Sequence, residues 1–311
     1  MSFTSLTLSF IVTVISTPLF GKLAIKLNIV DKPDGYLKPH EKVTPYLGGL
    51  AMFFGVLLST PFDPVIKVVL VTLVLIGTAD DIKNLKPLFR LVVEFIVGSL
   101  LAIRYLGLDM FTPVYVILTV ALINAVNMMD GMDGVCASLS IISAVGLVLT
   151  ATSRFDKILL LSLVGALAGY LIYNFPPARI FMGDGGSYLV GGILSSGVLS
   201  AFRNSGQTLH FKISAVIFVS LFLLDLVAAV MRRMINGRSP FLGDRDHTYN
   251  KIFRKVNNNR KTLLVVFSIG VLQFILGYIA LSSMLFSILS VIALIVIYTF
   301  LIFKLELLKL S

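Results

Sequence analysis

The sequence predicts an all-α integral membrane protein, folded as one polytopic bundle of ten or eleven transmembrane helices. Of its 311 residues, 57% are hydrophobic and only 14% are charged, whereas soluble domains carry about a quarter charged residues. The mean hydropathy is +0.96. Apolar runs near the roughly 20 residues that cross a bilayer recur along the chain. No repeat or low-complexity linker divides them, so we treat residues 1–311 as a single membrane domain.

The first apolar run has no basic residues before it and no small-residue cleavage site after it. We therefore interpret it as a retained helix and not as a signal peptide. The second, third and eighth runs are short, which leaves the count at ten or eleven. The expected helices span residues 3–21, 46–60, 65–79, 87–105, 111–127, 134–151, 157–174, 187–202, 212–232, 262–282 and 285–303.

The basic residues predict the orientation in the membrane. Most of the 26 Lys and Arg residues fall in the loops after the odd-numbered runs or in the C-terminal tail. The positive-inside rule then places these loops in the cytoplasm and the N-terminus outside. The same rule accounts for the net charge of +10 without a nucleic-acid partner. One cysteine excludes an internal disulfide, and the three histidines cannot form a zinc cluster at ligand spacing.

Acidic residues gather on the same predicted cytoplasmic side. Asp80 and Asp81 end one apolar run, with Lys86 and Arg90 following. Capping of the next helix is the alternative reading of this pair. Asp184 lies between glycines after a double proline, where its carboxylate would be exposed, and it could also cap the helix that follows.

Polar residues recur every third position at the end of the fifth predicted helix, at Asn124, Asn127, Asp130 and Asp133. That spacing keeps neighbouring members on one helical face. A glycine-rich turn capping the next helix would explain the aspartates but not the asparagines. In the longest loop Arg238, Asp244, Arg245, Asp246 and His247 interleave opposite charges. Carboxylates suit Mg²⁺ bound to a pyrophosphate, and guanidinium groups suit the phosphates themselves.

These motifs together resemble one family, the polyprenyl-phosphate N-acetylhexosamine-1-phosphate transferases. The resemblance runs from about residue 31 to residue 254, and the last-loop motif resembles the N-acetylglucosamine branch of the family. It rests on Asn-x-x-Asp-Gly-x-Asp-Gly at 127–134, Asn-Phe-Pro-Pro-Ala at 174–178, Met-Gly-Asp at 182–184, Asn-Gly-Arg-Ser-Pro-Phe at 236–241 and Asp-Arg-Asp-His at 244–247.

The resemblance implies transfer of N-acetylglucosamine-1-phosphate from UDP-N-acetylglucosamine to undecaprenyl or another polyprenyl phosphate, with release of UMP. It implies Mg²⁺, for which Mn²⁺ can substitute, and catalytic loops on the cytoplasmic face of the plasma membrane. A homodimer is compatible with the sequence. The implied catalytic residues are Asp80, Asp81, Asp130, Asp133 and His247; the implied substrate-binding residues are Lys38, His40, Lys86, Arg90, Asn127, Asn174, Arg238 and Arg245; the implied metal ligands are Asp184 and Asn127.

Two departures from the family pattern bear on the donor sugar and the nucleotide contacts. Gly185 replaces a threonine found in many members, and His247-Thr248-Tyr249-Asn250 replaces His-x-His-His. Another UDP-N-acetylhexosamine, or UDP-N-acetylmuramoyl-pentapeptide, therefore stays open as the donor. Direct attack and a two-step path through a phospho-aspartate also both stay open.

Parts of the sequence suggest three other classes of protein. An ion-coupled transporter is suggested by Glu94 and Asp225, which lie inside predicted helices, although pairing of Asp225 with Arg232, seven residues later, is an alternative. A CDP-alcohol phosphatidyltransferase is suggested by the Asp130-x-x-Asp133-Gly134 spacing, but Ser138 replaces the arginine of that motif. A scaffold without catalysis leaves the clustered motifs unexplained.

Overall fold

The computed structural model describes residues 2–31, 43–203, 208–240 and 243–310, and these residues form thirteen helices and one two-stranded ribbon. The all-α polytopic bundle is thus confirmed. The elements are α1 (Ser2–Lys26), β1 (Val30–Asp31), β2 (Thr44–Pro45), α2 (Gly48–Ser59), α3 (Pro64–Lys83), α4 (Pro87–Leu106), α5 (Thr112–Met129), α6 (Val135–Thr150), α7 (Arg154–Asn174), α8 (Gly183–Phe202), α9 (Leu209–Ile217), α10 (Ser220–Ile235), α11 (Thr248–Val256), α12 (Asn259–Ala280) and α13 (Met284–Leu305).

Each of the eleven predicted ranges coincides with helix, but the range 212–232 is broken. It forms α9 and α10, which meet at an angle of 63°. The Gln273 side chain satisfies the backbone at this break, because its Oε1 accepts from the Leu221 N–H at 3.0 Å and its Nε2 donates to the Phe218 carbonyl at 2.6 Å. Hydropathy does not reveal the break, since both halves are apolar. The short helix α11 was not predicted, because its sequence is polar.

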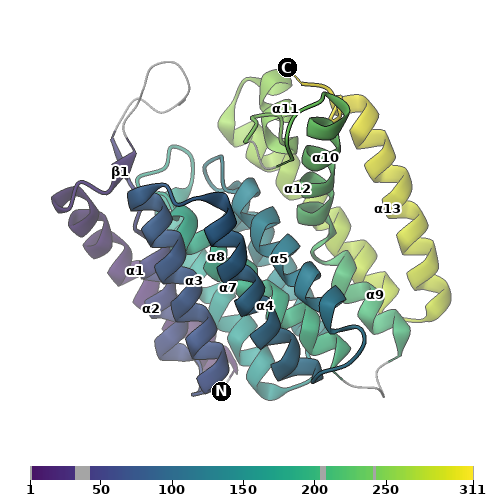
Figure 1. Ribbon diagram of the computed structural model, residues 1–311, viewed down its shortest axis with the longest axis horizontal. Coiled ribbons are helices and arrows are strands. Elements are labelled where there is room, and N and C mark those ends of the chain that lie inside the picture. Colours follow the sequence, from purple (N-terminus) through teal and green to yellow (C-terminus); the bar gives the residue numbers. More distant parts are fainter. Residues whose placement is uncertain (1, 32–42, 204–207, 241–242, 311) are drawn as a thin grey trace.

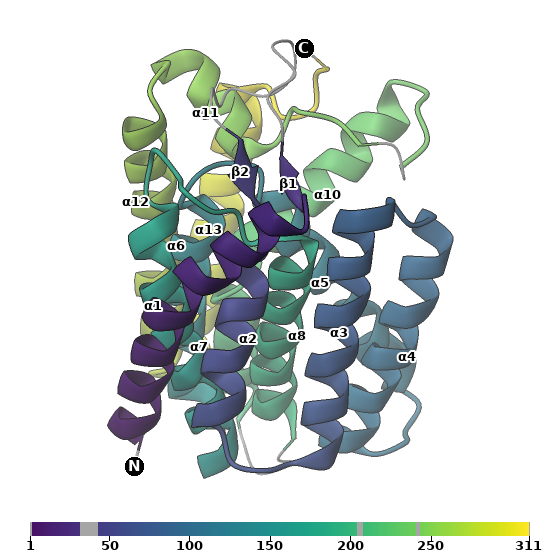
Figure 2. The same ribbon diagram turned by 90° about the vertical axis from the view of Figure 1, so that its left-hand side faces the viewer.

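Within the described residues, six helices are long and apolar enough to cross a membrane, and the bent pair α9–α10 makes a seventh. The short helices α2 and α6, together with α3 and α4, run alongside them (Figures 1 and 2). Helices α3 and α4 are as long as several of these spans but carry more charged residues, among them Asp80, Asp81 and Arg90. The count of ten or eleven crossings and the direction of insertion remain predictions.

Helix α8 lies at the centre of the bundle and packs against α2, α3, α5, α6 and α7. Glycines allow its neighbours to approach closely. A Cβ at Gly191 would lie 2.7 Å from the Ile123 Cα of α5, and a Cβ at Gly77 of α3 would lie 2.4 Å from the Asp184 carbonyl carbon. These approaches bring the end of α3, the end of α5 and the beginning of α8 together at one end of the bundle.

That end also carries the β1–β2 ribbon, α11 and the C-terminus, whereas the N-terminus lies at the opposite end (Figures 1 and 2). The loops that sequence analysis assigned to one side of the membrane therefore do lie together.

Candidate active site

Asp184 occupies the first turn of α8 and is held there by Asp81 of α3. The Asp81 Oδ1 accepts from the Asp184 N–H at 3.0 Å, and its Oδ2 lies 3.5 Å from the Gly185 nitrogen. The preceding residue, Gly183, has φ of +69°, and a Cβ there would lie 2.5 Å from the Asp81 Oδ2. Glycine is therefore needed for the backbone to turn into α8 beside this carboxylate.

Asn127, from the last turn of α5, contacts the Asp184 side chain. Its Nδ2 donates to the Asp184 Oδ1 at 2.6 Å and to the Ser187 Oγ at 3.0 Å. The two residues that the family resemblance implied as metal ligands are thus in direct contact, although 57 residues separate them in the chain.

Arg90, near the start of α4, is the cation closest to this carboxylate in the part of the chain that the structure describes. Its guanidinium forms a salt bridge with the buried Asp80 and lies 3.9 Å from the Asp184 Oδ2. It also lies 3.4 Å from the hydroxyl of Tyr188, one turn along α8. The second oxygen of Asp80 accepts from the Leu85 N–H at 2.7 Å, which fixes the turn between α3 and α4.

Asp130 follows α5 and faces the same carboxylates. Among the described residues its side chain has no hydrogen-bond partner. Burial raises its pKa well above the ordinary value, and the nearby charges of Asp184, Asp81 and Asp133 raise it further. Carboxylates therefore outnumber cations at this site, where Arg90 is the one basic side chain in contact with them among the described residues.

Asp133 and Asn174 join the α5–α6 turn to the α7–α8 connection. The Asp133 Oδ2 accepts from the Ala178 N–H at 2.9 Å. The Asn174 Oδ1 accepts from the Gly134 N–H at 2.8 Å, while its Nδ2 donates to the Ile180 carbonyl at 2.9 Å. The whole Asn174 amide is thus engaged with the main chain and buried, a geometry that suits positioning better than substrate contact.

The last loop forms a second polar cluster around His247. The imidazole Nδ1 lies 2.6 Å from the Oδ2 of Asp225 in α10. Nearby, Asp244 binds two buried guanidinium groups, that of Arg232 at 2.5 Å and that of Arg233 at 2.8 Å. Burial would raise the pKa of Asp244, but hydrogen bonds from Arg232, the Asp246 amide and Arg233 hold it below its ordinary value.

Tyr249 links the two clusters. Its ring stacks on His247 with centroids 5.8 Å apart, and its hydroxyl donates to the Met128 carbonyl at 3.3 Å. A Cβ at Gly131 would lie 1.9 Å from that hydroxyl, so the tyrosine fits only against glycine at the α5–α6 turn. The loop that carries His247 is therefore packed against the turn that carries Asp130.

Three predicted substrate-binding residues, Lys86, Arg238 and Arg245, have exposed side chains at the same end of the bundle. Lys38 and His40 lie outside the described residues. Exposure leaves the three basic side chains available to an anionic ligand.

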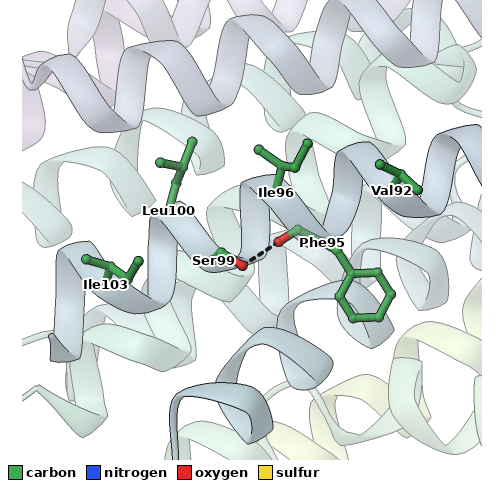
Figure 3. Close-up of a pocket in the computed structure, with 6 residues that line it drawn as sticks. All are labelled: Val92, Phe95, Ile96, Ser99, Leu100 and Ile103. Carbon is green, nitrogen blue, oxygen red and sulfur yellow. Dashed lines mark hydrogen bonds between the residues drawn. The ribbon is translucent and has the colours of Figure 1, made fainter. Parts of the chain in front are cut away.

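A groove elsewhere on the surface differs in character. It runs along the exposed face of α4 (Figure 3) and is lined by Val92, Phe95, Ile96, Ser99, Leu100 and Ile103. Its one hydroxyl, on Ser99, donates to the Phe95 carbonyl at 2.8 Å. A groove without charge or a free polar group cannot bind a pyrophosphate and suits contact with lipid.

The oxygen donors around Asp184 fit a hard divalent cation such as Mg²⁺. Within the described parts of the chain, no three His, Cys, Asp or Glu side chains form a complete metal-binding group. Mg²⁺ does not require one, since it usually takes one or two carboxylates together with water and substrate phosphates. Among the described residues, the Asp130 carboxylate without a partner and the excess of carboxylates over cations favour such an ion.

Comparison with known proteins decides the family. A model of glycosyl transferase family 4 matches residues 64–202. The chain is 30% identical over 288 residues to the undecaprenyl-phosphate alpha-N-acetylglucosaminyl 1-phosphate transferase of Yersinia pestis, covering 83% of this chain and 78% of that protein. The chain belongs to the polyprenyl-phosphate N-acetylhexosamine-1-phosphate transferase family.

Other members of this transferase family are similar to the chain at comparable levels. The probable undecaprenyl-phosphate N-acetylglucosaminyl 1-phosphate transferase of Bacillus subtilis is 29% identical over 289 residues, covering 84% of this chain and 80% of that protein. The decaprenyl-phosphate N-acetylglucosaminephosphotransferase of Mycobacterium leprae is 28% identical over 324 residues, covering 85% and 80%. The match to residues 64–202 runs from α3 to α8 and so includes the carboxylates around Asp184.

Several members of these two polar clusters were not predicted from the sequence. Asp225 and Glu94 were considered as elements of an ion path, with pairing of Asp225 to Arg232 as the alternative. In the structure Asp225 binds His247, and Glu94 binds the Asn124 amide. Tyr188 was not singled out, and the buried Arg232 binds Asp244 and not Asp225. The available signal was a carboxylate inside an apolar helix, which predicts a buried partner but does not identify it.

Proposed function

We propose that this protein transfers N-acetylglucosamine-1-phosphate from UDP-N-acetylglucosamine to polyprenyl phosphate at the cytoplasmic face of the plasma membrane. An oxygen of the lipid phosphate attacks the β-phosphorus of the nucleotide sugar, and the bond from that phosphorus to the bridging oxygen breaks. The products are polyprenyl-diphosphate-N-acetylglucosamine and UMP. Family membership supports the class of reaction.

The observation that carries the proposal is the junction of α3, α4, α5 and α8. Arg90 lies between the carboxylates of Asp80 and Asp184, and Asn127 binds the latter. Phosphoryl transfer depends mainly on positioning and on neutralising charge. A site in which acidic residues hold a metal and an arginine stands beside it provides both.

We propose Asp184, with Asn127 and Asp130 beside it, as the residues that hold Mg²⁺, for which Mn²⁺ can substitute. The ion, when bound, neutralises the pyrophosphate and makes its β-phosphorus more electrophilic. In this proposal Asp81 holds the first turn of α8 in place through the Asp184 amide.

Arg90 is proposed to bind the lipid phosphate, together with the exposed Lys86. Both lie at the start of α4, between the polar end of the bundle and the exposed apolar face of this helix. Asp80 orients Arg90 by the salt bridge between them and would accept a proton if the lipid phosphate arrives protonated.

The last loop is proposed to bind the nucleotide sugar. Arg238 and Arg245 are exposed at the same end of the bundle, and guanidinium groups bind phosphate oxygens in bidentate fashion. His247 lies nearby on a loop packed against the Asp130 turn, so one substrate can contact both clusters.

The experiment is UMP release by purified protein given UDP-N-acetylglucosamine, undecaprenyl phosphate and Mg²⁺, with EDTA and lipid-free controls. We expect release to require both the metal and the lipid, and Asp184→Asn to lower it about 100-fold or more. Release with another UDP-N-acetylhexosamine alone would change the donor and keep the reaction. No release with any donor from folded protein would refute the proposed function.

A further inference from the structure

Asp225 is a buried carboxylate in the middle of α10 that the proposed mechanism does not yet use. We propose that it is a positioning residue, which fixes the imidazole of His247 so that its Nε2–H faces a phosphate oxygen of the nucleotide sugar. This inference rests on the proposed function and deepens it.

Both oxygens of Asp225 are engaged. The Oδ1 accepts from the N–H and from the hydroxyl of Thr248, each at 2.7 Å, and the Oδ2 lies 2.6 Å from the His247 Nδ1. A carboxylate can only accept hydrogen bonds, so the Nδ1 must carry a proton. With Asp225 only 2% exposed, water does not compete for these contacts. An ion path would need a free carboxylate, which Asp225 does not offer.

The Nε2 is the nitrogen left for a ligand. Among the described residues, the acidic atom recorded nearest to it is the Asp244 Oδ1 at 3.9 Å, which is beyond hydrogen-bond range. That oxygen already accepts from Arg232 at 2.5 Å and from the Asp246 N–H at 3.1 Å. A phosphate oxygen of a bound substrate accepts hydrogen bonds, so in the proposed complex it faces an N–H at Nε2.

The ring has little freedom to turn away from this arrangement. It stacks on Tyr249 with an angle of 10° between the planes, and Tyr249 is itself packed against Gly131. The fixed carboxylate and the stacked ring together determine both the protonated nitrogen and the direction of the other one. This is how a carboxylate commonly orients a functional histidine.

Asp225→Asn tests the proposal. The asparagine Oδ1 can still accept from Thr248, but its Nδ2 then presents a donor to the Nδ1 of His247. The Nδ1 must lose its proton, and the ring can no longer carry a charge toward the substrate. We expect kcat/KM for UDP-N-acetylglucosamine to fall about 10- to 100-fold, mainly through KM, with little change in the KM for undecaprenyl phosphate.

A double-mutant cycle separates positioning from a general loss of structure. If Asp225 acts through His247, Asp225→Asn in a His247→Gln background lowers kcat/KM no further than His247→Gln alone. Additive losses would overturn the proposal. ¹⁵N NMR of labelled histidine gives a readout independent of turnover: wild type should show one ring protonated at Nδ1, and Asp225→Asn should change that signal alone among the three histidines.

Asp156→Asn is the matched control. Asp156 is also buried and accepts from the hydroxyls of Tyr105 at 2.9 Å, Ser153 at 2.7 Å and Ser200 at 2.6 Å, but it lies in the first turn of α7, at the other end of the bundle. We expect no change in the KM for the nucleotide sugar or in the His247 signal. An equal loss in this variant would show a general effect of buried charge and refute the inference. Wild type without turnover but with the expected NMR signal would refute the proposed function alone.

Discussion

Gly185→Ala should loosen the active site through a single added methyl group. A Cβ at this position would lie 2.6 Å from the Thr78 Oγ1 and 3.1 Å from both the Thr78 nitrogen and the Val74 carbonyl oxygen. The hydroxyl can rotate away, but the two backbone atoms belong to α3 and cannot. The two helices must therefore separate by a few tenths of an ångström.

Overpacking of this kind costs about 1–3 kcal/mol. For a chain of this size each kcal/mol lowers the melting temperature by roughly 2–4 °C. The strained contact is next to the hydrogen bond from the Asp184 N–H to Asp81, so we expect UMP release to fall as well. Thr78→Ala in the same variant removes the 2.6 Å contact and should restore part, but not all, of both losses.

Cys136 provides the assay, because it is the one cysteine of the chain and is buried until the protein unfolds. A thiol-reactive fluorophore then reports the melting temperature in detergent. Gly21→Ala is the control, since its Cβ would meet only Ile180 at 3.7 Å and Pro45 at 3.9 Å, which are ordinary contacts. Equal melting temperatures for the Gly185→Ala and Gly21→Ala variants would refute the packing argument.

Three further predictions concern charged residues, and the last of them tests the membrane topology. The pKa of Asp130 is raised in the folded protein, so the folded state binds this proton more tightly than the unfolded chain and loses stability as pH rises above the usual carboxyl range. In EDTA, the Asp130→Asn variant should therefore have a higher melting temperature than wild type at pH 8, and this difference should vanish toward pH 4. UMP release by the same variant should fall. Asp63 caps α3 by accepting from the Ile66 N–H at 3.0 Å and binds Arg104 at 2.7 Å. The Asp63→Ala variant should therefore lose about 1–2 kcal/mol of stability and keep its turnover. Lost turnover would contradict an active site confined to the opposite end of the bundle. In cells, a membrane-impermeant maleimide should label Arg203→Cys from outside and Lys261→Cys only after permeabilisation; the reverse would invert the topology.

The sequence predicted the helical elements well where hydrophobicity decides them. Every apolar run became helix, because a backbone in lipid must satisfy its hydrogen bonds internally. It could not predict the break between α9 and α10, which depends on a distant glutamine, Gln273, satisfying the freed backbone groups. It could not predict α11 either, because that helix is stabilised by packing and carries no apolar run.

For the site, the sequence alone predicted which residues carry the chemistry and that they lie together, and the structure confirms that Asn127, Asp184 and Arg90 meet at one end of the bundle. Asn127 continues a polar stripe inside an otherwise apolar helix, where amides are expensive to bury, Asp130 ends that stripe, and Asp184 lies between glycines after a double proline, so these residues could be singled out without a structure. Their roles toward metal and substrate remain predictions that UMP release will test.

Only the tertiary structure decided which of these residues face one another and which hold the backbone. Asp133 and Asn174 are bound to main-chain groups, whereas Asp130 has no such partner among the described residues. The pairing of Asp225 with His247 likewise depends on the direction in which α10 leaves its break. Hydropathy and local spacing report what each segment buries, but the partner of a buried group is set by helices that meet from distant parts of the chain.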